Sequence, residues 1–168
     1  MSAERTRRGL LLATASLALS GLTACALPPR KSADAGQPSW SGRLALQVEG
    51  DQRNSFSAGF ELLGTAQAGE LSLYSPLGAT LAQLRWSPGM AELVAEGKRR
   101  EYPSIEALTQ EATGTALPLA ALFAWLAGHA ADVPGWQADL SRIADGRLQA
   151  RRSDPLPVAD LRIVLQQP

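Results

Sequence analysis

Hydrophobic and polar residues alternate along much of the chain after residue 40. The first clear run places Leu44, Leu46 and Val48 on one side, with polar or small residues between them. A period of two is typical of a β-strand with one buried face. The same reasoning predicts short strands separated by turns over 44–48, 55–62, 70–73, 80–86, 92–96, 136–140, 147–152 and 161–165, with 97–102 as a further extension.

The residues between these runs predict turns. Residues 50–54 form a polar segment between the first two strands, and Asp145–Gly146 has the composition of a hairpin turn. Pro155 and Pro157 fall where the last hairpin would run. Because proline cannot donate a hydrogen bond to a neighbouring strand, we expect one strand there to be missing or to lie at an edge.

The period changes to that of a helix in the middle of the chain. Apolar residues at helical spacing predict one helix over 104–112, with Ser104 in the capping position. They predict a second over 117–127 that starts with Pro118 and ends at Gly128. The order of strands, two helices and strands predicts a mainly β fold, one antiparallel sheet whose concave face the helices cover.

The first 24 residues have the pattern of a secretory signal peptide. A short basic segment is followed by an apolar stretch too short to span a bilayer comfortably, and then by small residues. We therefore expect residues 1–24 to be removed, 25–39 to form the N-terminus and a flexible Pro-containing linker, and 40–168 to fold.

Cys25 is the only cysteine, and it follows Leu22-Thr23-Ala24. This segment resembles the bacterial lipobox, which implies that Cys25 is the mature N-terminus and is acylated. Ala26, in place of Asp, then implies the outer membrane. The alternative is an ordinary secreted protein with a stray thiol.

Composition removes several classes of function. The 168 residues suit one domain, and 16 basic residues balance 16 acidic ones. With 5% aromatic residues as well, the chain lacks both a basic field and a base-stacking surface, so we expect no binding of nucleic acid. One cysteine and one histidine leave no zinc motif and no catalytic constellation. We expect no metal, no cofactor and no enzymatic activity, although a hydrolase with an unrecognised serine stays a remote alternative.

Four segments in order carry a resemblance to a known family. They are Trp40-Ser-Gly-Arg-Leu-Ala-Leu46, Ser75-Pro-Leu-Gly-Ala-Thr80, Leu117-Pro-Leu with Trp125-Leu-Ala-Gly128, and Gly135-Trp136. Together with the lipobox they resemble LolB, the outer-membrane lipoprotein receptors.

The resemblance implies a half-open antiparallel β-barrel with helices as a lid over an apolar cavity. It implies a monomer that accepts cargo lipoproteins by their acyl chains from a LolA-like periplasmic carrier. The receptor then inserts them into the inner leaflet of the outer membrane. The alternative is a structural or general lipid-binding envelope lipoprotein on a similar barrel.

Inward positions of the predicted strands and second helix are the candidates for lining an acyl cavity. They are Leu44, Leu46, Phe56, Phe60, Leu73, Leu84, Trp86, Leu122 and Trp125. Alternation alone does not distinguish a cavity from a solid core, and ordinary core packing is the alternative at each position.

Leu77 differs from these residues because it lies between Pro76 and Gly78 in a predicted loop. The resemblance implies that this leucine protrudes and delivers cargo to the membrane. The alternative is that Leu77 folds back and plugs the end of the barrel.

The basic run 98–100 has two interpretations as well. It could contact anionic headgroups or a carrier, or its charges could protect the edge of a sheet from pairing with another chain.

Overall fold

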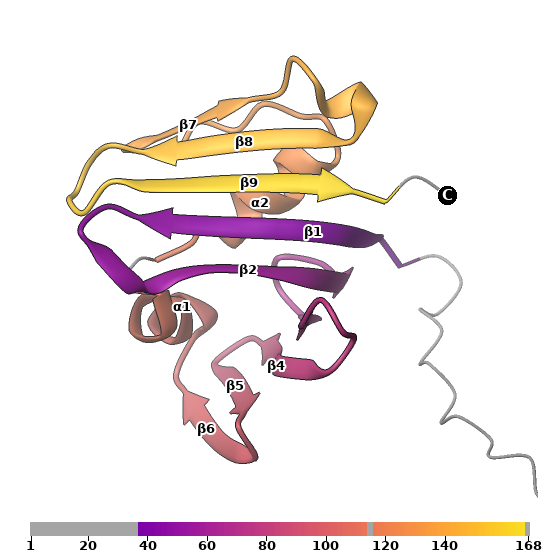
Figure 1. The fold of residues 1–168 in the computed structure, drawn as a ribbon, viewed down its shortest axis with the longest axis vertical. Helices are drawn as coiled ribbons and strands as arrows, with labels where there is room; N and C mark the ends of the chain where they lie inside the picture. The colour runs from indigo at the N-terminus through magenta and orange to yellow at the C-terminus, as the bar shows by residue number, and fades with distance from the viewer. Residues whose placement is uncertain (1–36, 114–115, 167–168) are drawn as a thin grey trace, which may run out of the picture. The chain divides into compact units, whose positions relative to one another are not determined.

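A computed structural model describes residues 37–113 and 116–166, all within one compact unit that spans residues 33–168. Nine strands form a single sheet in the order β6-β5-β4-β3-β2-β1-β9-β8-β7, and every neighbouring pair is antiparallel (Figure 1). The strands are β1 (Ser39–Val48), β2 (Asp51–Gly64), β3 (Gly69–Tyr74), β4 (Thr80–Ser87), β5 (Met90–Ala95), β6 (Lys98–Tyr102), β7 (Trp136–Asp139), β8 (Arg147–Arg152) and β9 (Ala159–Leu165).

The sheet is open, because β6 and β7 form its two edges and do not pair with each other in the described part of the chain. The predicted fold class, a mainly β half-open barrel with a helical insert, is confirmed. The strand ranges predicted from alternation also agree with the structure, and β8 has the predicted bounds.

The helices follow β6, as predicted. Helix α1 (Ile105–Thr113) is capped by Ser104, whose Oγ accepts a hydrogen bond from the Ala107 N–H at 3.2 Å. Helix α2 (Leu119–Leu126) begins after Pro118.

Gly128 ends α2 at a φ of +80°, where a side chain would be strained. The N–H groups of Gly128 and His129 donate to the carbonyls of Trp125 and Ala124, which closes the last turn. Gly114, whose residue type also predicts the end of the first helix, lies outside the described residues.

Two of the predicted turns, and one expectation about a strand, differ from the structure. The turn predicted over 50–54 is only Glu49–Gly50, since Asp51 already pairs with Val48 and the register then shifts. The Asp51 carboxylate accepts hydrogen bonds from the backbone N–H groups of Arg53 and Asn54, which explains the polar composition of this irregular stretch.

Near the C-terminus, Asp145–Gly146 is not a two-residue hairpin turn. A 3₁₀ helix (Ile143–Asp145) lies between β7 and β8, and Gly146 follows it in the left-handed conformation. The expectation of a missing or edge strand is wrong as well. Pro155 and Pro157 lie in the loop 153–158, so β8 and β9 both form complete ladders, and neither is an edge.

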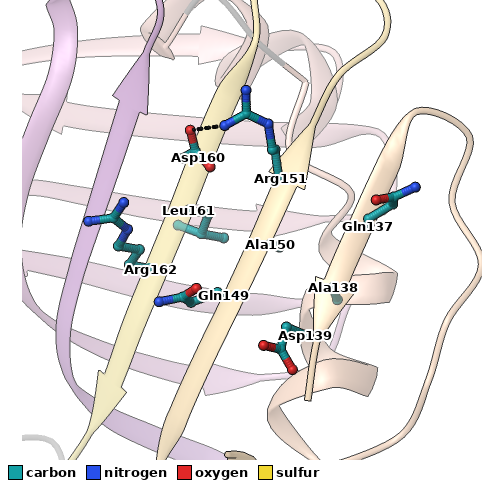
Figure 2. A pocket seen from close by; sticks show the side chains of 9 residues that line it. All are labelled: Gln137, Ala138, Asp139, Gln149, Ala150, Arg151, Asp160, Leu161 and Arg162. Carbon is teal, nitrogen blue, oxygen red and sulfur yellow. Dashed lines mark hydrogen bonds and ion pairs between the residues drawn. The ribbon is translucent and has the colours of Figure 1, made fainter. Parts of the chain in front are cut away.

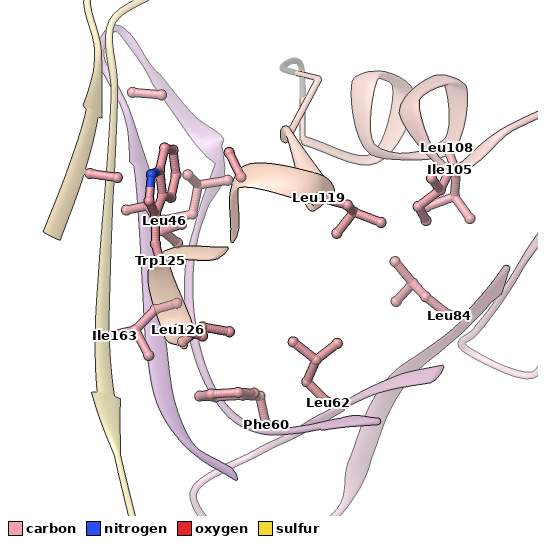
Figure 3. Packing of buried hydrophobic residues seen from close by; sticks show 14 of the residues in the cluster. Leu46, Phe60, Leu62, Leu84, Ile105, Leu108, Leu119, Trp125, Leu126 and Ile163 are labelled. Carbon is pink, nitrogen blue, oxygen red and sulfur yellow. The ribbon is translucent and has the colours of Figure 1, made fainter. Parts of the chain in front are cut away.

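The inner faces of the strands and both helices share one hydrophobic core. Figure 3 shows Ile105 and Leu108 of α1 and Leu119 of α2 pointing into the same interior as Leu62 and Leu84 of the sheet. None of the helices in the described part of the chain is long and apolar enough to cross a membrane.

Candidate acyl-binding interior and the Leu77 loop

The structure brings all nine predicted interior residues into one cluster. Leu46, Phe60, Leu84, Trp86 and Trp125 are buried. Leu44, Phe56, Leu73 and Leu122 are half-buried and pack against them. The set comes from four neighbouring strands, β1 to β4, and from α2. The residues are therefore placed together as alternation predicts, while their contact with acyl chains stays a prediction.

Helix α2 is the element that closes this interior. Phe123 packs edge-on against Trp40 of β1 and Trp86 of β4, with ring centroids 5.4 Å and 6.4 Å away. Trp125, which is 1% exposed, lies 6.3 Å from Trp136 of β7. These rings connect α2 to β4 in one half of the sheet, to β1 near its middle, and to β7 at the opposite edge. The helix therefore crosses the inner face of the sheet.

The contacts that hold α2 to the sheet are apolar. The backbone hydrogen bonds of the helix and its caps are all local, and the indole N–H of Trp125 donates to the carbonyl of Ala131, in the segment after the helix. Among the described residues no hydrogen bond or ion pair joins α2 to a strand. Moving α2 away from the sheet therefore exposes apolar surface but leaves no polar group newly unpaired.

The loop between β3 and β4 presents Leu77 to solvent. Its side chain is 98% exposed, which contradicts the alternative of a plug in the barrel end. The loop is braced beneath it: the Gly78 N–H donates to the Ser75 carbonyl at 2.9 Å, and the Ser75 N–H donates to the Ala79 carbonyl at 2.8 Å. A leucine held outward on a braced turn buries no surface within this chain, so its apolar surface is available to a partner.

The basic run at the start of β6 is largely occupied by ion pairs. Arg99 pairs with Glu92 at 2.6 Å, and Arg100 lies 3.7 Å from Glu111. Both pairs lie at the exposed edge strand, which fits the reading of charges that protect a sheet edge.

A shallow polar groove of about 320 Å³ lies across the outer face of β7, β8 and β9 (Figure 2). Outward side chains such as Gln137, Gln149 and Arg162 line it, and Arg151 forms an ion pair with Asp160 there at 2.8 Å. The groove is on the face opposite the core, since Leu148 of β8 does not line it and is buried in the core.

Comparison with known proteins identifies the family. A family model described as outer membrane lipoprotein LolB matches residues 37–161. The chain belongs to the LolB family. Its relatives include the outer-membrane lipoprotein LolB of Chromobacterium violaceum, 34% identical over 84% of this chain and 77% of the relative. The LolB of Bordetella petrii is 30% identical over 96% and 93% of the two chains.

The LolB assignment confirms the resemblance predicted from the four segments and covers the whole sheet up to β9. The relatives are named as outer-membrane lipoproteins. Cys25, the proposed site of lipid attachment, lies outside the described residues, and so does the linker up to residue 36.

Sequence reasoning missed one residue of the LolB-family interior. Arg152 ends β8 on the inner face and is only 5% exposed. One of its terminal nitrogens, Nη2, donates to the Pro157 carbonyl at 2.7 Å, whereas its buried Nε has no hydrogen-bond partner among the described residues. Burial lowers the pKa of this guanidinium. The signal was available, since period two puts Arg152 on the side of Leu148 and Ala150.

Proposed function

We propose that this chain is an outer-membrane lipoprotein that receives other lipoproteins from a soluble LolA-like carrier in the periplasm and inserts them into the inner leaflet of the outer membrane. One observation carries the proposal. A single apolar interior, shared by the sheet and both helices, is closed by helix α2, and the contacts that hold α2 to the sheet in the described part of the chain are apolar. The receptor performs this transfer as a monomer and without covalent chemistry.

The energetics of the cargo explain why such an interior is needed. A buried methylene contributes about 0.8 kcal/mol, so an acyl chain of roughly 15 methylenes costs about 12 kcal/mol to expose to water. A lipoprotein with two or three chains therefore cannot cross the periplasm uncovered. A receptor that binds the chains more tightly than the carrier, and less tightly than the bilayer, transfers them without ATP.

The same interior explains how acyl chains enter. The acyl chains replace contacts between α2 and the sheet. The proposed lining residues, from Leu44 on β1 to Trp125 on α2, then shield the acyl chains from water. Because α2 forms no hydrogen bond with a strand among the described residues, opening costs only apolar exposure, which the incoming chains offset.

Leu77 is proposed to act at the last step, when the cargo leaves for the membrane. Its exposed side chain on a braced turn enters the lipid and brings the domain to the bilayer surface. Acylated Cys25 holds the protein in the outer membrane, and the sequence between Cys25 and β1 connects this anchor to the domain. The domain faces the periplasm, where the carrier arrives.

A transfer assay tests the proposal. The chain from residue 25 onward, with Cys25→Ala, is mixed with carrier that is loaded with a labelled lipoprotein, in the absence of ATP. Affinity capture of each protein then reports where the label resides. Movement of the label to this chain supports the receptor function.

Two controls sharpen the result. Labelled cargo whose acyl chains have been removed, mixed with the carrier and the receptor, must not be captured with the receptor, because the acyl chains are the proposed handle. If the label stays on the carrier while circular dichroism shows a folded receptor, the receptor function is wrong. A structural or general lipid-binding envelope lipoprotein is then the better account.

A further inference from the structure

Arg152 is a buried cation on the apolar face of the sheet. On the strand β8, the inward side chains are Leu148, Ala150 and Arg152, and each is at most 5% exposed. Across the ladders Arg152 pairs with Trp136 of β7 and Ala159 of β9, both of which are buried members of the core. Its side chain thus lies on the core side of the sheet at the end of β8, and its guanidinium reaches the carbonyl of Pro157 in the loop 153–158.

The chain supplies this cation with little compensation. A guanidinium offers five N–H donors and stays protonated in proteins. Arg152 has one hydrogen bond to a carbonyl, a buried Nε without a partner, and no part in any of the five ion pairs of the described residues. A charge buried without a counter-charge is unfavourable unless an acceptor reaches it.

The neighbouring residue shows the contrast. Arg151 points to the outer face, is exposed, and forms an ion pair with Asp160 at 2.8 Å. The side chain that faces solvent therefore has a carboxylate partner, whereas the side chain that faces the core has none within residues 37–113 and 116–166. An apolar ligand with an ionised head group would supply an acceptor for Arg152.

We propose that Arg152 binds the carboxylate of a long-chain fatty acid whose hydrocarbon chain occupies the apolar interior. This inference rests on the proposed acyl-binding function and adds a ligand with a free acid head, held by a charged hydrogen bond. The carboxylate lies at the Arg152 end of β8. The chain runs from there along Ala150 and Leu148, beside Trp136 and Trp125.

The binding of palmitate and of methyl palmitate tests this inference. The two ligands share the same chain and differ in the head group, so their difference reports the contact with Arg152. Displacement of a fluorescent fatty-acid analogue from the Cys25→Ala chain measures both. We expect palmitate to bind at least tenfold more tightly than its ester, because a hydrogen bond to an ionised group is stronger than one to a neutral carbonyl.

Two substitutions distinguish an effect of the Arg152 charge on binding from an effect on folding. Arg152→Met keeps much of the apolar stem and should weaken palmitate about 10- to 100-fold, with methyl palmitate changed less than threefold. Arg151→Met, the matched control on the outer face, should change neither ligand. Thermal unfolding of each variant shows whether the fold is retained.

A measurement on the unsubstituted interior keeps the test valid if Arg152→Met does not fold. The carboxyl carbon of ¹³C-labelled palmitate, followed by NMR, should titrate at a lower pH when bound than in a detergent micelle, because the guanidinium stabilises the carboxylate. A bound carboxyl that titrates at the same pH as in the micelle overturns the proposal.

The remaining outcomes distinguish this proposal from the receptor function. Equal binding of palmitate and its ester, both unaffected by Arg152→Met, contradicts the Arg152 site but leaves the acyl interior intact. A lower melting temperature with unchanged head-group preference shows that Arg152 only supports the loop at Pro157, which also contradicts it. If neither ligand binds and no label moves in the transfer assay, the proposed receptor function itself fails.

Discussion

Replacing Leu77 with glutamate should separate cargo acceptance from delivery to the membrane. The side chain is 98% exposed, and the bonds that brace its turn are made by the backbone of Ser75, Gly78 and Ala79. Leu77→Glu therefore removes no contact within the domain, and we expect the free energy of unfolding to change by less than about 0.5 kcal/mol. The interior that accepts acyl chains should be unchanged.

The effect on delivery follows from the area that the side chain can bury. Because nearly all of Leu77 is accessible, its transfer into lipid contributes about 1.5–3 kcal/mol. At about 1.4 kcal/mol per factor of ten, its loss weakens contact with the bilayer roughly 10- to 150-fold. A glutamate at the same place adds the cost of bringing a charge to the lipid surface.

The assay has two stages that use the same labelled lipoprotein. The first measures movement of the label from the carrier to the receptor, and the second measures its movement from the loaded receptor to vesicles recovered by flotation. Leu77→Glu should leave the first rate within about twofold, a change that corresponds to about 0.4 kcal/mol, and slow the second at least tenfold.

Leu156→Glu is the matched control, since Leu156 also follows a proline in an exposed loop and is 77% exposed. A specific role of Leu77 predicts normal delivery by this variant. The reasoning is refuted if Leu77→Glu delivers cargo at the unsubstituted rate, or if both variants lose delivery equally.

Three further predictions concern the fold that supports the interior. Gly135→Ala should cost about 3 kcal/mol or more in chemical denaturation, because a Cβ there overlaps the backbone of the facing loop. Gly50→Ala has a similar positive φ but open space around it, and should cost only about 1 kcal/mol. Trp125→Ala should cost about 3–5 kcal/mol and raise the binding of a dye for exposed apolar surface; a loss below about 1 kcal/mol contradicts tight packing of α2. The pKa of Tyr74 is raised above 10.0, chiefly by burial and also by the carboxylate of Glu61, so the folded state keeps this proton more tightly and loses stability as the pH rises above 10.0. An absorbance titration should show that one tyrosine loses its proton at a higher pH than a free tyrosine does. In the Tyr74→Phe variant, the free energy of unfolding should fall less with pH in that range.

Local patterns in the sequence predicted most of the secondary structure. The bounds of β8 followed from alternation along the strand, and the end of α2 followed from the glycine at position 128. Both are local features of the sequence. The errors occurred where pairing between strands, and not the composition of a segment, decides the structure. Residues 51–54 have the composition of a turn, but they enter β2 because Asp51 pairs with Val48.

The candidate site shows the same division. Alternation placed the apolar interior residues on one face, and the sheet then brought them together with α2. Arg152 was missed because two consecutive arginines are usually taken as solvent-exposed, although strand alternation requires one of them to face inward. Arg152 is the inward one, since it lies on the same side of β8 as Leu148 and Ala150 and pairs with the buried Ala159 of β9.

The manner in which α2 is held bears on whether a packed interior can also be a binding site. A core closed by hydrogen-bonded elements opens only if those bonds are lost, at about 1–3 kcal/mol for each buried group left unpaired. Here the contacts of Phe123 and Trp125 with the sheet are between apolar rings, and an acyl chain offers apolar, although aliphatic, surface in exchange. The free energy of opening is thus mostly regained when the chain is covered. A solid core in the empty protein and an acyl-filled interior in the loaded protein are therefore compatible states of one fold.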